Sequence, residues 1–123
     1  MKWISLLLGG LAGTAARYVV AGTIFRTFGS RFPYGTLIVN LSGCFTLGFF
    51  AAFLEERAIV SQEIRLLLLI GFCGAYTTFS TWVLETDLLM REGEPALALA
   101  NILGSIAGGF LLFRAGILLG KII

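Results

Sequence analysis

The sequence is notable first for what it lacks: it has no histidine, and only 13% of its 123 residues are charged. The absence of histidine excludes a histidine-ligated metal site and a serine–histidine nucleophile pair. A soluble domain of this length usually carries about twice that charged fraction. The net charge is only +2 and no basic tract is present, so nucleic acid is not an expected partner.

Cysteine is also scarce, whereas apolar residues dominate. The two cysteines, Cys44 and Cys73, fall in separate apolar runs, so we expect packed thiols rather than a disulfide. The hydrophobic fraction is 58% and the mean hydropathy is +0.95. This composition predicts a membrane protein and not an enzyme.

Four apolar runs are long enough to cross a bilayer, which takes about 20 residues. They cover residues 3–25, 35–54, 66–84 and 95–113, and only the first contains a charge, Arg17. The first run continues past that charge without a processing site, so it predicts a transmembrane helix and not a signal peptide. We therefore expect an all-α, multi-pass protein of the cell (plasma or inner) membrane. Its single domain, residues 1–123, has helices at roughly 3–25, 35–54, 66–90 and 95–120.

The middle of the third run is unlike a simple lipid-facing helix. Residues 71–82 contain two glycines and five hydroxyl side chains, namely Tyr76, Thr77, Thr78, Ser80 and Thr81. Irregular backbone at membrane depth is tolerated only where protein or a water-filled cavity surrounds it. Discontinuous helices of this kind mark ion or substrate sites near the membrane midplane. We expect the third helix to be broken near its middle, with an ion site at the break.

Positive charges are almost evenly divided between the two sides of a four-span topology. One side carries Lys2, Arg57, Arg65, Arg114 and Lys121, and the other carries Arg17, Arg26, Arg31 and Arg91. Orientation normally follows an excess of Lys and Arg on the cytoplasmic side, and five against four is almost no excess. Two interpretations remain open: a weakly specified single orientation, or dual topology with antiparallel pairing of two copies.

Polar and aromatic side chains inside the spans indicate what such a site could bind. Asn40 lies among apolar neighbours, Asn101 and Ser105 share a helix face, and Phe79 and Trp82 share another. Amide and hydroxyl donors and the electropositive edges of aromatic rings suit a small anion. A cation pathway would show buried carboxylates instead. The simpler interpretation is interhelical hydrogen bonding and core packing by the same side chains.

These residues resemble the fluoride channel family called CrcB or Fluc, over essentially the whole chain. The resemblance rests on GAYTTFSTW (residues 74–82) followed by Glu85, on GTLIVN (35–40), and on Gly9, Gly10, Gly13 and ARY (16–18) in the first helix. It implies an antiparallel, dual-topology homodimer with two fluoride pores, embedded in membrane lipid. Such a channel passively exports fluoride, lowers cytoplasmic fluoride and so confers fluoride resistance.

The resemblance also implies an anion pathway. Asn40 matches an asparagine that presents its amide to fluoride, and Phe79 matches a phenylalanine whose ring edge faces the anion. Ser80 and Thr81 match hydroxyl positions beside the pore, and Ser105 matches a serine of a polar track in the fourth helix.

Two positions of this pathway depart from the family pattern. Trp82 stands where the family usually has phenylalanine, and it adds an indole N–H donor. Asn101 stands where many members have tyrosine.

A cation site and a vestibule are implied in the same way. Gly74 and Thr77 match positions whose backbone carbonyls bind a structural sodium ion at the centre of the dimer. Arg17 matches a first-helix arginine near the vestibule, and Glu85 matches an acid that follows the aromatic pair.

The alternative function is that of a small multidrug-resistance transporter driven by protons, because such proteins are also short four-helix dimers of dual topology. Their activity depends on an acidic residue in the first helix, and residues 3–25 contain no Asp or Glu. A third possibility is an assembly subunit without transport activity, which would not account for the hydroxyl-rich segment.

Overall fold

The computed structural model describes residues 1–57 and 60–123, and all regular structure in these ranges is helical. The elements are α1 (Lys2–Phe28), α2 (Tyr34–Glu55), α3 (Gln62–Arg65), the π-helical segment η1 (Leu66–Cys73), α4 (Gly74–Tyr76), α5 (Phe79–Arg91) and α6 (Pro95–Ile122). Four helical stretches, the third running from Gln62 to Arg91, are long and apolar enough to cross a membrane. The prediction of an all-helical chain with four spans is therefore confirmed.

Short connections join the spans, and glycine allows two of the turns. Gly29 after α1 and Gly93 after α5 have φ values of 77° and 76°, a region that L side chains rarely adopt. Pro95 then occupies the first turn of α6, where its missing N–H costs no hydrogen bond.

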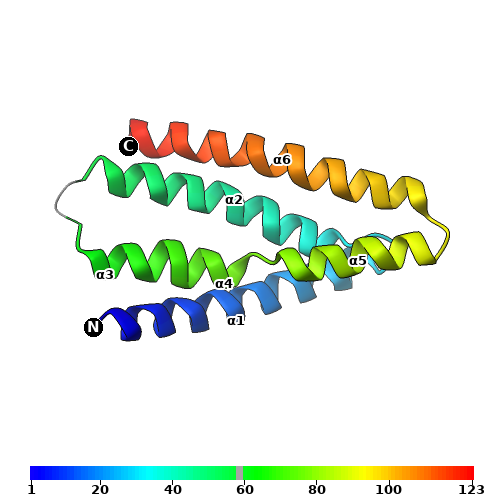
Figure 1. The fold of residues 1–123 in the computed structure, drawn as a ribbon, viewed down its shortest axis with the longest axis horizontal. Coiled ribbons are helices and arrows are strands. Elements are labelled where there is room, and N and C mark those ends of the chain that lie inside the picture. The colour runs from blue at the N-terminus through cyan, green and yellow to red at the C-terminus, as the bar shows by residue number, and fades with distance from the viewer. Residues whose placement is uncertain (58–59) are drawn as a thin grey trace.

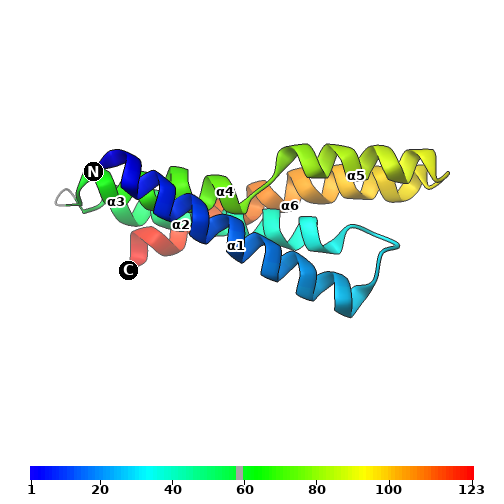
Figure 2. The same ribbon diagram turned by 90° about the horizontal axis from the view of Figure 1, so that it is seen from below.

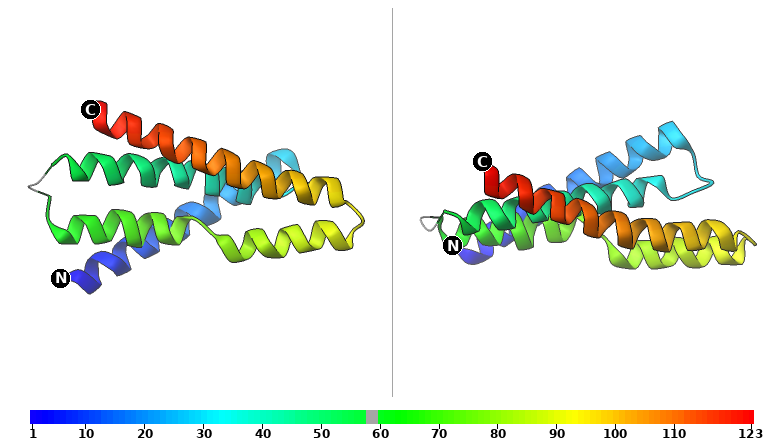
Figure 3. Two further views of the ribbon diagram at one scale, coloured as in Figure 1. Left: turned by 45° about the horizontal axis from the view of Figure 1, so that its top comes forward. Right: turned by 90° about the horizontal axis from the view of Figure 1, so that it is seen from above.

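The spans pack mainly as two pairs: α2 with α6, and α1 with the first half of the third span (Figure 1). The most extensive contact joins α2 to α6, and α1 packs along η1 and α4. Beyond the middle of the molecule α5 leaves α1 and packs on α6 instead (Figure 2). The connection between α1 and α2 consequently diverges from the connection between α5 and α6, and that end of the molecule is forked (Figures 2 and 3).

Glycine sets the distance between the helices where their backbones touch. A Cβ atom on Gly9 of α1 would lie 2.2 Å from the carbonyl oxygen of Leu67 on η1. A Cβ atom on Gly116 of α6 would lie equally close to the carbonyl oxygen of Phe45 on α2, at 2.2 Å. Small residues commonly serve this purpose in membrane proteins, where close van der Waals packing holds helices together.

Candidate functional site

The third span departs from helical geometry at two residues. α4 ends at Tyr76, and Thr77 (φ −82°, ψ 158°) and Thr78 (φ −147°, ψ 118°) are extended before α5 begins at Phe79. The side chain of Asn40 on α2 pairs with the backbone of Thr78 in both directions. The Thr78 amide donates to Asn40 Oδ1 at 2.8 Å, and Asn40 Nδ2 donates to the Thr78 carbonyl at 2.9 Å. Asn40 thus replaces hydrogen bonds that the interrupted helix cannot supply.

The threonines at the interruption are held by local hydrogen bonds. Thr78 caps α5, because its Oγ1 accepts from the amide of Thr81 at 3.3 Å and also donates to Thr81 Oγ1 at 3.0 Å. Thr77 Oγ1 donates to the carbonyl of Cys73 at 3.0 Å. The N-terminus of α5 is therefore well defined, and its positive dipole end lies beside Asn40.

A small cavity of about 330 Å³ lies beside this N-terminus, between α2, α5 and α6. It brings together four residues predicted for the anion pathway: Asn40, Phe79, Trp82 and Ser105. The two aromatic rings are tilted by 41° with centroids 5.4 Å apart. None of its ten described lining residues carries a charge, so we call it the uncharged cavity.

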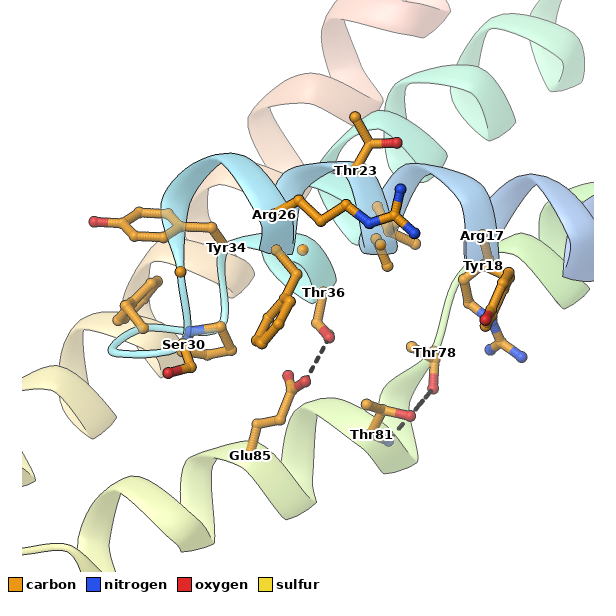
Figure 4. A pocket seen from close by; sticks show the side chains of 18 of the residues that line it. Arg17, Tyr18, Thr23, Arg26, Ser30, Tyr34, Thr36, Thr78, Thr81 and Glu85 are labelled. Carbon is orange, nitrogen blue, oxygen red and sulfur yellow. Dashed lines mark hydrogen bonds between the residues drawn. The ribbon is translucent and has the colours of Figure 1, made fainter.

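A larger cavity of about 740 Å³ opens between α1, α2 and α5 (Figure 4). Its walls include Arg17, Arg26, Glu85 and Glu92, so we call it the charged cavity. Both residues predicted for a vestibule, Arg17 and Glu85, line it. Figure 4 shows Arg17 below α1, beside the segment that contains Thr78.

Glu85 is held in this cavity by one hydrogen bond. Thr36 Oγ1 on α2 donates to Glu85 Oε1 at 2.9 Å (Figure 4). The other carboxylate oxygen, Oε2, is buried and has no hydrogen-bond partner within residues 1–57 and 60–123. Thr36 was not predicted as a site residue, because its 49-residue separation from Glu85 leaves no local signal.

The remaining predicted pathway residues lie elsewhere. Thr81 lines the charged cavity, and Ser80 is exposed and lines neither cavity. Asn101 is only 1% exposed and lies between α5 and α6, outside both cavities. Its partner Thr86 was not predicted, although it shares a face of α5 with Trp82 four residues earlier.

The two residues predicted to bind a cation lie at the interruption. Gly74 is exposed, and the Thr78 amide, which a continuous helix would direct to the Gly74 carbonyl, donates to Asn40 instead. The Thr77 carbonyl accepts from Arg17 Nη1 at 3.4 Å. The described part of the chain holds no cluster of three or more His, Cys, Asp or Glu side chains. The backbone carbonyl oxygens of Gly74 and Thr77 belong to the class of ligand that can coordinate a hard monovalent cation.

Comparison with known proteins places this geometry in context. The family model described as CrcB-like protein, Camphor Resistance (CrcB), matches residues 4–117. A protein of Desulforapulum autotrophicum is 44% identical over 122 residues, which cover 99% of this chain and 98% of the relative. A protein of Solibacter usitatus is 43% identical over 98% of this chain and 99% of the relative. A third protein, from Chlorobaculum tepidum, is 46% identical over 93% of this chain and 90% of the relative. All three relatives carry the name fluoride-specific ion channel FluC.

Proposed function

The chain belongs to the CrcB family, and we propose that it is a channel that conducts fluoride passively out of the cell. It is a multi-pass membrane protein with four helices able to span the bilayer, and the inner (plasma) membrane is its expected location. The observation that carries the proposal is the uncharged cavity, where Asn40, Phe79, Trp82 and Ser105 meet beside the N-terminus of α5.

The chemistry of this cavity suits a small anion that must pass and not stay. Asn40 Nδ2 has a second N–H besides the one directed to Thr78, and Phe79 and Trp82 supply two aromatic rings, whose edges are electropositive. Ser105 also lines the cavity, and its hydroxyl would have to turn from Asn101 Oδ1, 3.5 Å away, to donate to the anion. The positive end of α5 adds a favourable field without a formal charge. Conduction requires sites from which the ion can leave, and a fixed cation would hold fluoride too tightly.

We further propose that two copies pair in antiparallel orientation, each contributing one four-helix domain with a discontinuous third helix. Phe79 is 75% exposed in the single chain, and Gly74, on the other side of the interruption, is also exposed. A second copy would cover both residues and complete the walls of the cavity. Reporter fusions to the C-terminus should then signal from both sides of the membrane, and a signal from one side alone would contradict the homodimer.

A structural sodium ion would lie between the two copies, bound by the carbonyls of Gly74 and Thr77 from each. The freed carbonyl of Gly74 supports this assignment, whereas Arg17 shares the carbonyl of Thr77. Sodium would hold the two interrupted spans together and would not take part in conduction. Replacing sodium with a larger cation throughout purification should reduce fluoride flux, and unchanged flux would count against the site.

The test of the proposed function is fluoride efflux from proteoliposomes that contain the purified protein, with chloride efflux as the comparison. We expect fluoride to leave down its own gradient at equal pH on both sides, and chloride to be retained. A proton-coupled transporter would need a pH gradient, and it would need an acid that residues 3–25 do not supply. Absence of fluoride efflux from well-folded protein would reject the channel.

A further inference from the structure

A buried amide links the last two helical segments behind the uncharged cavity. Asn101 on α6 is 1% exposed, and its Nδ2 donates to Thr86 Oγ1 on α5 at 2.9 Å. Thr86 Oγ1 in turn donates to the backbone carbonyl of Trp82 at 2.7 Å. The indole Nε1 of Trp82 closes a ring by donating to the backbone carbonyl of Asn101 at 3.4 Å. Two hydrogen bonds therefore tie α5 to α6 at one level, one from the Asn101 amide and one from the Trp82 indole.

The same amide also reaches a residue of the cavity wall. Ser105 Oγ, one turn further along α6, donates to Asn101 Oδ1 at 3.5 Å. Asn101 therefore contacts both Ser105 and Trp82, which line the uncharged cavity, while it lies outside that cavity itself. Burying an amide is costly unless its hydrogen bonds are made, so an apolar side chain would fill this position at lower cost. The hydrogen bonds of Asn101 are therefore its main contribution here.

We propose that Asn101 is a positioning residue that holds Trp82 and Ser105 in the cavity wall and so determines how well the wall fits fluoride. The proposal rests on the proposed function for its consequence, although not for its geometry. When the link to Thr86 is lost, α5 and α6 can shift relative to each other, because within the described residues only the longer indole bond, at 3.4 Å, then joins them through a side chain. The indole then moves in the wall, fluoride passes less readily, and larger anions are excluded less strictly.

The experiment uses the full chain with the substitution Trp3→Phe, which leaves Trp82 as the sole tryptophan. Acrylamide quenching of fluorescence then reports how accessible the Trp82 indole is, independently of transport. Thr86→Val removes the hydroxyl that accepts from Asn101, and Thr86→Ser keeps it. Thr46→Val is the matched control, because among the described residues Thr46 Oγ1 bonds only the carbonyl of Ser42, in its own helix.

We expect Thr86→Val to raise the quenching of Trp82 and to lower fluoride flux by about tenfold, equivalent to ~1.4 kcal/mol. The ratio of fluoride flux to chloride flux should fall as well. Thr86→Ser and Thr46→Val should match the parent in all three measurements. Asn101→Ala should reproduce Thr86→Val, and if that larger change prevents folding, Thr86→Val decides the matter alone.

Two results would overturn the proposal. One is quenching of Trp82 in Thr86→Val that equals quenching in Thr46→Val. The other is a Thr86→Ser protein that behaves like Thr86→Val, because the hydroxyl would then have no role. A parent protein without fluoride flux would reject the proposed function, and the quenching series would still test the position of Trp82.

Discussion

The two cavities on either side of Thr78 differ in size and in charge. The charged cavity measures about 740 Å³ and is lined by two arginines and two glutamates. The uncharged cavity measures about 330 Å³ and offers an amide, hydroxyls and aromatic rings. Thr78 lines both, so the interruption of the third span forms the boundary between them. We interpret the charged cavity as the place where ions collect from water, and the uncharged cavity as the place where an anion loses its hydration shell.

The difference in charge between the two cavities has a physical basis, because the strength of a charge depends on how much water surrounds it. In a wide cavity open to water, each charge is screened, so opposite charges can line it without trapping an ion. In a narrow apolar cavity a full charge would act at a much lower dielectric constant, and it would bind or repel an ion strongly. Substitutions that move charge between the two cavities, or that remove a neutral donor, should therefore have very different effects.

The largest effect should come from Asn40→Asp, which places a negative charge in the uncharged cavity. The variant keeps an acceptor for the Thr78 amide but loses the donor to the Thr78 carbonyl. Fluoride flux should fall on the order of 100-fold, because an unsatisfied buried acceptor costs about 1–3 kcal/mol and the carboxylate repels the anion. Proteoliposome flux measures this, with helicity by circular dichroism as the check on folding. A folded variant that conducts normally would remove Asn40 from the pathway.

Removing the aromatic edge should have a smaller effect. Phe79→Ile keeps apolar bulk but loses the polarised ring that faces Trp82. We expect fluoride flux to fall about tenfold, because contacts of this kind contribute on the order of 1 kcal/mol. Phe110→Ile is the matched control, since Phe110 is also exposed, at 66%, and lines neither cavity. Equal flux in the two variants would make Phe79 a packing residue.

Neutralising a positively charged side chain of the charged cavity should lower fluoride flux less, and the loss should depend on salt concentration. Arg26, in the last turn of α1, lines this cavity, whereas Arg31, on the connection that follows α1, is exposed and does not line it. Arg26→Gln should lower flux about threefold at low ionic strength, and the loss should vanish near 1 M salt, where the Debye length is about 3 Å. Arg31→Gln should show no such dependence. A salt-independent loss in Arg26→Gln would contradict a gathering role.

The smallest effect is expected for Trp82→Phe. Phenylalanine keeps a ring edge in the uncharged cavity and loses only the 3.4 Å bond from the indole to the Asn101 carbonyl, while the shorter bond from Asn101 to Thr86 remains. Flux should stay within about threefold of the parent, because a neutral hydrogen bond contributes roughly 0.5–1.5 kcal/mol at most. Parallel flux assays on the two proteins measure the ratio, and a tenfold loss would show that the indole donor is itself required.

Hydropathy alone was sufficient to predict the class and the number of spans. A bilayer requires about 20 apolar residues per helix, so the four runs could be counted directly. Prediction was weaker at the helix ends: α1 continues to Phe28 and α6 to Ile122, because polar residues outside the hydrocarbon region can still extend a helix. The motif in residues 74–82 pointed to the family that the comparisons then established.

The pairing of residues far apart in the chain was decided by the tertiary structure alone. Asn40 and Thr78 are 38 residues apart, and nothing local indicates that the amide would bond the backbone of an interrupted helix. The position of Asn101 was likewise not predictable. Its polarity and helix face are as typical of a pathway residue as of a buried one, and the structure buries it against Thr86. Composition determines that a segment enters the membrane, because transfer from water depends on each side chain. Which polar groups meet there depends on how the helices pack, because each buried donor must find an acceptor in three dimensions.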